Sequence, residues 1–141
     1  MTGRDDVFAE LHRALPVRLF TVTLNDRAAA VYRRLYSSHP GVYPAPGTKP
    51  MTQEDLSDKG PGTVFLANDP VGVTAALPDH ETVAAMGCGS ILTLPIGDAA
   101  GPPLGTVNLL DVAGHFTPVR IAACKAEVAA RADRLVRALL A

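Results

Sequence analysis

The sequence contains few of the residues that build metal sites and disulfide frameworks. Two cysteines, Cys88 and Cys124, and four histidines occur among 141 residues. The cysteines stand far apart with no C-x-x-C spacing, and no pair of histidines follows an H-x-x-x-H pattern. We therefore expect neither a zinc site, nor any other metal centre, nor a framework of disulfides.

An excess of charge and long apolar runs are also missing. Thirteen Lys and Arg stand against fourteen Asp and Glu, a net charge of -1, so no overall field would hold nucleic acid or an anionic membrane. No apolar run approaches the roughly 18 residues needed to span a bilayer. The opening MTGRDDVFAELH carries two aspartates and no apolar signal region. We expect a cytoplasmic protein with no nucleic-acid or membrane partner.

What is present is the composition of one ordinary globular domain. Apolar residues make up 48% and charged residues 19%. A chain of this length buries about two-thirds of its unfolded surface without metals or disulfides. No internal repeat or domain boundary is visible, so we predict a single domain over 1–141.

The first third of the chain predicts a helix and two strands. An apolar face with aspartates in its first turn predicts a helix over 5–15, which Pro16 ends. Strict alternation predicts a strand over 17–25. Segment 27–40 is ambiguous, since its alanines and arginines favour helix while Val31, Tyr32, Leu35 and Tyr36 suit a strand, and we predict a strand over 30–37.

The remainder predicts a long loop followed by mixed elements. Residues 39–62 hold five of the twelve prolines and four of the twelve glycines, which predicts the longest irregular stretch. The predicted elements in and after it are a short helix at 52–57, a strand at 63–67, short helices within 70–86, a hairpin of 90–96 and 104–111 across the turn 97–103, and a long helix over 117–139. Because β-α-β alternation is absent, we expect an α+β fold with a central, largely antiparallel sheet.

Two segments carry a family resemblance. The run 88-CGSILTLPIGDAAGPPLGTVNLLDVAGHFT-117 resembles the last two strands of a GAF domain and the start of its terminal helix, and 63-TVFLANDP-70 resembles the strand and ligand-side segment before them. The resemblance implies a GAF/PAS-like sheet with the N- and C-terminal helices on one face. On the other face, loops and short helices enclose a small-molecule pocket.

The resemblance also implies a general role but no particular cofactor. GAF domains bind cyclic nucleotides, bilins, haem or small metabolites, often as sensors fused to an output domain. No D-x-C-F bilin-attachment pattern or N-K-x-x-E/D cyclic-nucleotide pattern occurs, and we see no output domain in the sequence. The expected function is therefore a stand-alone, sensor-type domain that binds a small polar or anionic molecule.

The predicted strands divide into a polar and an apolar set. The partly polar alternating set is Thr21, Thr23, Thr93, Thr106 and Asn108, and the apolar set is Phe20, Val22, Leu24, Leu92, Leu94, Val107 and Leu109. Helices would cover the apolar set. The polar set is either a solvated sheet face or the lining of a ligand pocket.

Most of the predicted ligand contacts lie in or beside the proline-rich loop, residues 39–62, or belong to the polar set of strand residues. They are Tyr36, Tyr43, Lys49, Asn68, Thr93 and Asn108. Aromatic and cationic groups held by prolines lose little entropy on binding, and Lys49 would meet a negative group. The alternative is a surface loop whose tyrosines pack on their own prolines.

Cys88 raises a second functional hypothesis. Stand-alone GAF proteins include thiol-dependent reductases of free methionine-R-sulfoxide, but here the loop 75–87 that resembles their cysteine-bearing loop has no cysteine. Cys124 falls on the apolar stripe of the terminal helix. We therefore predict that Cys88 is a small buried residue, which favours a binding domain over an enzyme, and the thiol-dependent reductase stays open as the alternative.

A third hypothesis is an interaction module without a ligand. In it the terminal helices form a homodimer through Leu15, Leu139 and Leu140.

Overall fold

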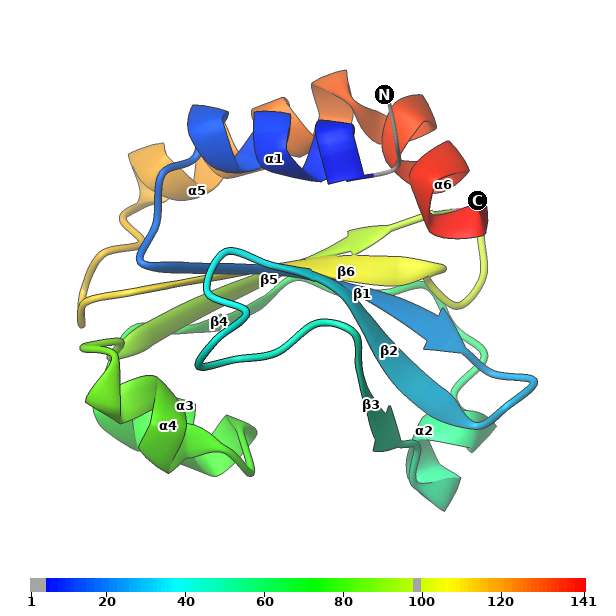
Figure 1. Cartoon of the computed structure of the whole chain (residues 1–141), viewed down its shortest axis with the longest axis horizontal. Coiled ribbons are helices and arrows are strands. Elements are labelled where there is room, and N and C mark those ends of the chain that lie inside the picture. The colour runs from blue at the N-terminus through cyan, green and yellow to red at the C-terminus, as the bar shows by residue number, and fades with distance from the viewer. Residues whose placement is uncertain (1–4, 98–99) are drawn as a thin grey trace.

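The computed structural model describes residues 5–97 and 100–141, a layered α+β structure (Figure 1). Residues 1–4 of the predicted domain and 98–99 of the predicted turn lie outside this range. The elements are α1 (Asp5–Ala14), β1 (Leu19–Asp26), β2 (Val31–Ser37), β3 (Gly47–Pro50), α2 (Gln53–Ser57), β4 (Phe65–Ala67), α3 (Pro70–Ala76), α4 (His80–Ala85), β5 (Ser90–Ile96), β6 (Gly105–Asp111), α5 (Pro118–Ala130) and α6 (Ala132–Leu140).

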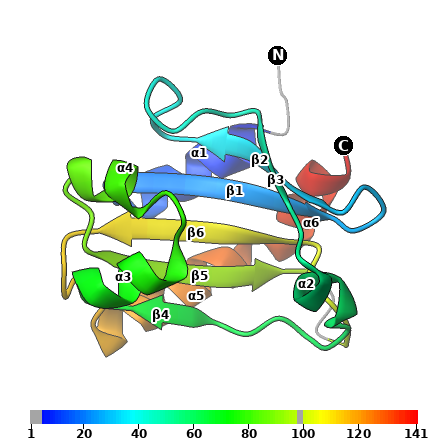
Figure 2. The same ribbon diagram turned by 90° about the horizontal axis from the view of Figure 1, so that it is seen from below.

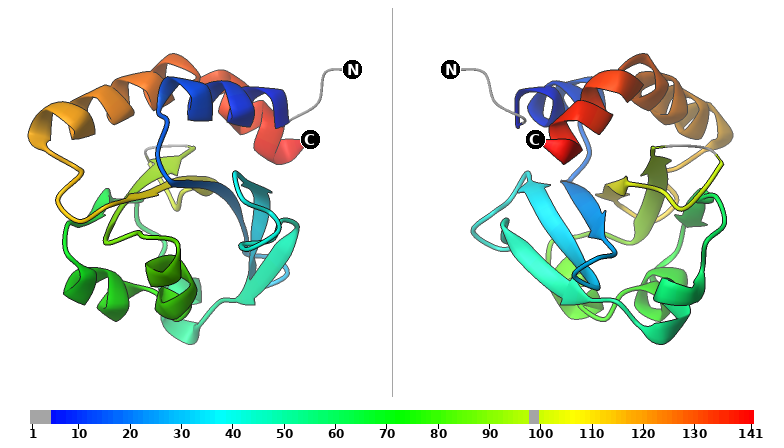
Figure 3. Two further views of the ribbon diagram at one scale, coloured as in Figure 1. Left: turned by 60° about the vertical axis from the view of Figure 1, so that its left-hand side comes forward. Right: turned by 90° about the vertical axis from the view of Figure 1, so that its right-hand side faces the viewer.

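The strands form one sheet in the order β3-β2-β1-β6-β5-β4, and every neighbouring pair is antiparallel. Helices α1, α5 and α6 cover one face, while α2, α3 and α4 lie on the other (Figures 1 and 3). Both the antiparallel sheet and this arrangement of helices confirm the prediction. In the described part of the chain, no helix combines the length and apolar character needed to cross a membrane.

The face under α1, α5 and α6 holds the main core. All but one of the predicted apolar set are buried there, and Leu24 packs partly against them. Phe8 and Leu11 of α1 and Leu135 of α6 meet the sheet with no exposed surface. Burying one such side chain contributes roughly 1.5–3 kcal/mol, so this layer dominates the stability of the fold.

The predicted long terminal helix is wrong in one respect, because the chain breaks at Arg131 into α5 and α6. Arg131 has φ -115° and ψ 12°, outside helical geometry. Its guanidinium bonds Glu127 at 2.8 Å and Glu10 of α1 at 2.7 Å, and α6 packs on α1. Ala132, the first residue of α6, is exposed.

Strand β3 is a second difference from the prediction, since it forms inside the stretch expected to be irregular. It pairs with β2 from Val31↔Pro50 to Arg34↔Gly47. Its proline stands at the strand's end on the edge of the sheet, where a missing N–H is tolerated.

A β-bulge in β2 changes which face its side chains reach. Val22 pairs with Tyr36, but the next residue, Thr23, pairs with Arg34, so Leu35 is left over. A residue without a partner inverts the alternation beyond it. Tyr36 therefore lies on the helix-covered face, where its ring centroid is 5.9 Å from those of both Phe8 and Phe20.

Two of the three leucines of the predicted dimer interface are buried in the protein's own core. Leu15 and Leu139 are buried within the chain, and only Leu140 is exposed. The homodimer itself stays a prediction.

Candidate functional site

A pocket of about 270 Å³ lies on the polar face of the sheet. On this face α3 and α4 lie at one end, and β3 with α2 at the other (Figure 2). Leu77, which follows α3, Lys49 of β3 and Asp55 of α2 all line the pocket. Its floor contains all five members of the polar set: Thr21, Thr23, Thr93, Thr106 and Asn108. The polar set thus lines a pocket.

Asn108 organises this floor through three hydrogen bonds. Its Oδ1 accepts from the Thr93 hydroxyl at 3.1 Å, and its Nδ2 donates to Thr21 Oγ1 at 3.1 Å and Thr23 Oγ1 at 3.2 Å. A hydroxyl that accepts from an amide keeps its own hydrogen free. Thr21 and Thr23 can therefore donate to an acceptor in the pocket.

The strand register gives the pocket a gradient of polarity. The first row across the sheet is apolar, with Leu110 between Leu19 and Ile91, and the next is polar, with Asn108 between Thr21 and Thr93. Further along, Thr106 pairs with Thr23, which pairs with Arg34. The last row joins Asn25, Tyr32 and Lys49.

The charged end is built from β2, β3 and α2. Burial first, and then the nearby Asp55 carboxylate, raise the pKa of Tyr32 to about 12, so its hydroxyl stays protonated and donates to Asp55. The backbone N–H of Thr52 lowers the pKa of Asp55, and Lys49 adds to that effect. At neutral pH this end therefore presents the Asp55 carboxylate beside a lysine ammonium.

Arg34 connects the floor to the proline-rich loop. Its guanidinium carbon lies 3.7 Å from the centre of the Tyr43 ring, and its Nη1 donates to the carbonyl of Pro44 at 2.8 Å. Burial first, and then a hydrogen bond to Asp79, raise the pKa of Tyr43 to about 12. Tyr43 thus links the loop to the segment before α4 and covers one face of the Arg34 guanidinium.

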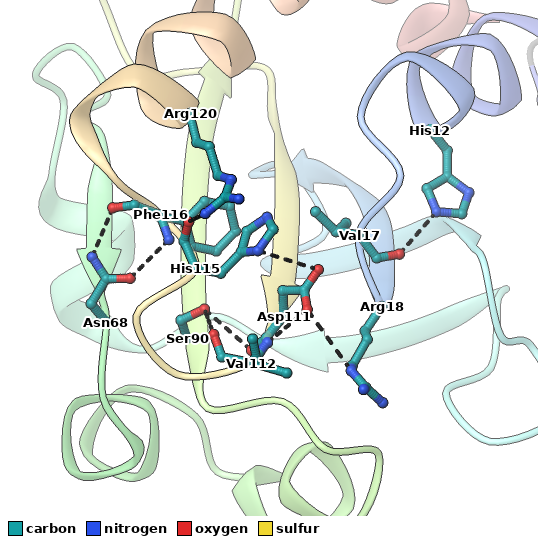
Figure 4. Close-up of polar contacts among 10 residues, drawn as sticks. All are labelled: His12, Val17, Arg18, Asn68, Ser90, Asp111, Val112, His115, Phe116 and Arg120. Atoms are coloured by element: carbon teal, nitrogen blue, oxygen red, sulfur yellow. Dashed lines mark hydrogen bonds and ion pairs between the residues drawn. The ribbon is translucent and has the colours of Figure 1, made fainter.

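Four of the six predicted ligand contacts come together in this pocket: Tyr43, Lys49, Thr93 and Asn108. The structure does not bring Tyr36 or Asn68 to it. The bulge places Tyr36 in the core. The side-chain amide of Asn68 instead forms two hydrogen bonds with the backbone of Phe116. It donates to the Phe116 carbonyl at 2.9 Å and accepts from the Phe116 N–H at 3.1 Å (Figure 4).

Sequence reasoning missed Tyr32, Arg34 and Asp55. Alternation along the predicted strand 30–37 groups Tyr32 with Arg34, and that signal was available. The same alternation wrongly adds Tyr36, because a bulge has no reliable sequence signature. The position of Asp55 depends on how α2 folds back, which no local pattern reveals.

Cys88 lies outside the pocket lining, in a small cluster with Val83, Ile91 and Leu110 under α3 and α4. Burial first, and then the Asp111 carboxylate, raise the pKa of its thiol to about 11. Asp111 is itself held by its neighbours, with Arg18 and His115 each 3.8 Å from its carboxylate (Figure 4). A nucleophilic cysteine needs the opposite shift.

The second cysteine, Cys124, is not placed to form a disulfide with Cys88. Cys124 is a free, buried thiol in the main core on the other face of the sheet, and burial raises its pKa too. This geometry gives the reductase hypothesis no support. Across residues 5–97 and 100–141, no group of three or more His, Cys, Asp or Glu side chains is placed to hold a metal ion.

Comparison with solved structures identifies the fold. The GAF domain/HD domain protein from Geobacter sulfurreducens superposes with a TM-score of 0.66 at 16% identity, over 98% of this chain and 95% of that one. The GAF domain of an Acinetobacter phosphoenolpyruvate-protein phosphotransferase gives 0.55 at 12% identity, over 98% and 85%. Residues 122 to 287 of a methyl-accepting chemotaxis protein give 0.63 at 17% identity, over 95% and 87%.

These likenesses show that the protein has a GAF-like fold, as the sequence resemblance implied. No protein-family model and no curated protein matches the sequence.

Proposed function

We propose that this protein is a sensor-type GAF-like domain that binds a small polar or anionic molecule in the pocket on the polar sheet face. The observation that carries the proposal is the floor held together by Asn108, in which the Thr21 and Thr23 hydroxyls accept from Asn108 and keep their own hydrogens available in a pocket of about 270 Å³. Ligand sites usually start near about 300 Å³, so this volume suits a small metabolite.

Two further features support a binding role. Lys49 and Arg34 add positive charge to the lining, and Tyr43 is already held over Arg34. Groups fixed before binding cost less entropy when a ligand arrives. The structurally similar chemotaxis protein and GAF domain/HD domain protein agree with a sensory role.

A thermal-shift screen of small metabolites, followed by calorimetry on the compounds that raise Tm, tests the proposal. We expect at least one small polar or anionic compound to bind, and Lys49→Ala to weaken its binding roughly tenfold, because a hydrogen bond to a charged group contributes about 1.5–3 kcal/mol. Lys59→Ala is the matched control, since Lys59 is exposed and outside the pocket lining.

Unchanged affinity in Lys49→Ala would remove Lys49 from the site. A screen in which no compound raises Tm would overturn the binding function.

A further inference from the structure

We propose that the ligand is a small monocarboxylate with a short apolar tail, its carboxylate between Arg34 and Lys49 and its tail against Ile91 and Leu110. This inference rests on the proposed function and names the chemical class and the orientation of the molecule in the pocket.

The anionic group is assigned to the end of the pocket that holds two cations. Within the described residues, neither Arg34 nor Lys49 forms an ion pair closer than 4 Å. The third charged lining residue is Asp55, so the lining carries two positive charges and one negative, a net +1. That sum matches a single negative charge, whereas a dianionic phosphate would be left with uncompensated charge.

The contacts that fix the Arg34 guanidinium leave donors that suit a planar oxyanion such as a carboxylate. Tyr43 covers one face of its guanidinium, and one N–H of Nη1 is committed to the Pro44 carbonyl. A guanidinium has five N–H donors in a fixed plane, so the remaining ones can meet both oxygens of a carboxylate. The backbone at Gly47 makes room for this arrangement, since a Cβ there would lie 3.3 Å from Nη1.

The apolar tail is assigned to the opposite end. Ile91 and Leu110 are 4% and 3% exposed and lie side by side in the first row of the floor. Leu77, at the end of α3, and Tyr43 pack against the cluster that contains them and also line the pocket. Each Å² of apolar surface that a ligand buries here is worth about 25 cal/mol.

The floor between the two ends limits the tail's length. Thr106, in the row of Arg34, is four residues from Leu110 along β6, a separation of roughly 14 Å at 3.4 Å per residue. Side chains from both ends occupy part of that distance. A tail of a few carbons fits, and hydroxyl donors of Thr21 and Thr23 remain for polar atoms along it.

Calorimetric titration of the whole chain with a matched set of probes tests the inference. The reference probe is 4-methylpentanoate. Its amide keeps the shape without the charge, acetate keeps the charge without the tail, and leucine adds an ammonium group that Asp55 would meet. We expect the amide and acetate each to bind at least roughly tenfold more weakly than 4-methylpentanoate.

Two adjacent arginines provide the matched variants. Arg34→Gln should raise the Kd of 4-methylpentanoate at least about tenfold. Arg33→Gln should leave it unchanged, because Arg33 lies on the opposite face of β2 and pairs with Asp26 at 2.9 Å. Tighter binding of leucine that Asp55→Asn abolishes would identify the monocarboxylate as an amino acid.

The failures of the two proposals are distinguishable. Equal binding of the amide or of acetate, no binding of 4-methylpentanoate, or an Arg34→Gln variant with unchanged Kd would each overturn the ligand class. If a neutral polar compound or a different anion then binds and Lys49→Ala or Thr93→Val weakens it, the binding function stands. Absence of any bound compound would overturn both.

Discussion

At the scale of single residues, the environment of Cys88 decides between two chemistries. Glycines on both sides would suit a thiol presented on a loop. The structure instead encloses Cys88 among apolar side chains, and the negative charge of the Asp111 carboxylate acts on its thiol. Both surroundings favour the neutral thiol, so Cys88 acts as a small packing residue.

We expect Cys88 to resist a maleimide reagent in the native protein at neutral pH and to react only on unfolding. Peptide mass analysis would follow it separately from Cys124. Native labelling with a midpoint well below pH 8 would contradict this prediction and revive the reductase.

The same thiol has a stability signature. It keeps its proton to about pH 11 in the folded protein but releases it near pH 9 when unfolded. Between those values the unfolded state binds fewer protons, so its contribution to stability falls as pH rises.

At the scale of secondary-structure elements, two irregularities shape the molecule. The bulge in β2 sends Arg34 to the pocket and Tyr36 to the core. The break at Arg131 brings α6 against α1. There the Glu10 carboxylate accepts hydrogen bonds from the guanidinium groups of both Arg131 and Arg134. Each irregularity is fixed by contacts from a different element.

In the Glu10→Gln variant, stability should fall less steeply than in the wild type as the pH is lowered below 4.5. Hydrogen bonds from Arg134 and then Arg131 lower the pKa of Glu10 from 4.5 to about 2. The stability it contributes is complete above pH 4.5 and is lost as pH falls toward 2, and the variant lacks it throughout.

Tm measured against pH checks this prediction. Glu81→Gln on α4 is the control, since Glu81 forms no ion pair among the described residues. Parallel curves for the wild type and Glu10→Gln would show that the ion pairs of Glu10 with Arg131 and Arg134 contribute no net stability.

At the scale of the whole molecule, the two faces of the sheet differ in how firmly they are built. The helix-covered face holds a large continuous core, while the pocket face has a smaller cluster of buried residues. Helix α2 buries no residue, and Arg27 in the turn between β1 and β2 holds it by donating to the carbonyls of Asp55 and Leu56. The face of the sheet that carries the pocket is thus expected to be the less stable one.

Hydrogen exchange should show this difference directly. We expect amides of β3 and α2 to exchange well before those of β1 and β6, because few buried contacts hold them. Arg27→Ala should speed exchange in α2 alone, and a pocket ligand should slow exchange in β3 and α2. Simultaneous exchange of α2 and β6 would mean that the molecule opens as one unit.

Local patterns in the sequence were sufficient for much of this architecture. Period-two alternation identified β1, β5 and β6 and separated Phe20 and Val22 from Thr21 and Thr23, since side chains of a strand alternate between faces. The same separation, with the loop composition, singled out Tyr43, Lys49, Thr93 and Asn108, which line the pocket.

Only the tertiary structure decided the rest. The bulge at Leu35, the break at Arg131 and the return of Asp55 to the pocket each depend on residues distant in the chain. Arg34 and Tyr36 are two positions apart and would share a face in a regular strand. Pairing with β1 places one in the pocket and the other in the core, because register is a property of two strands together.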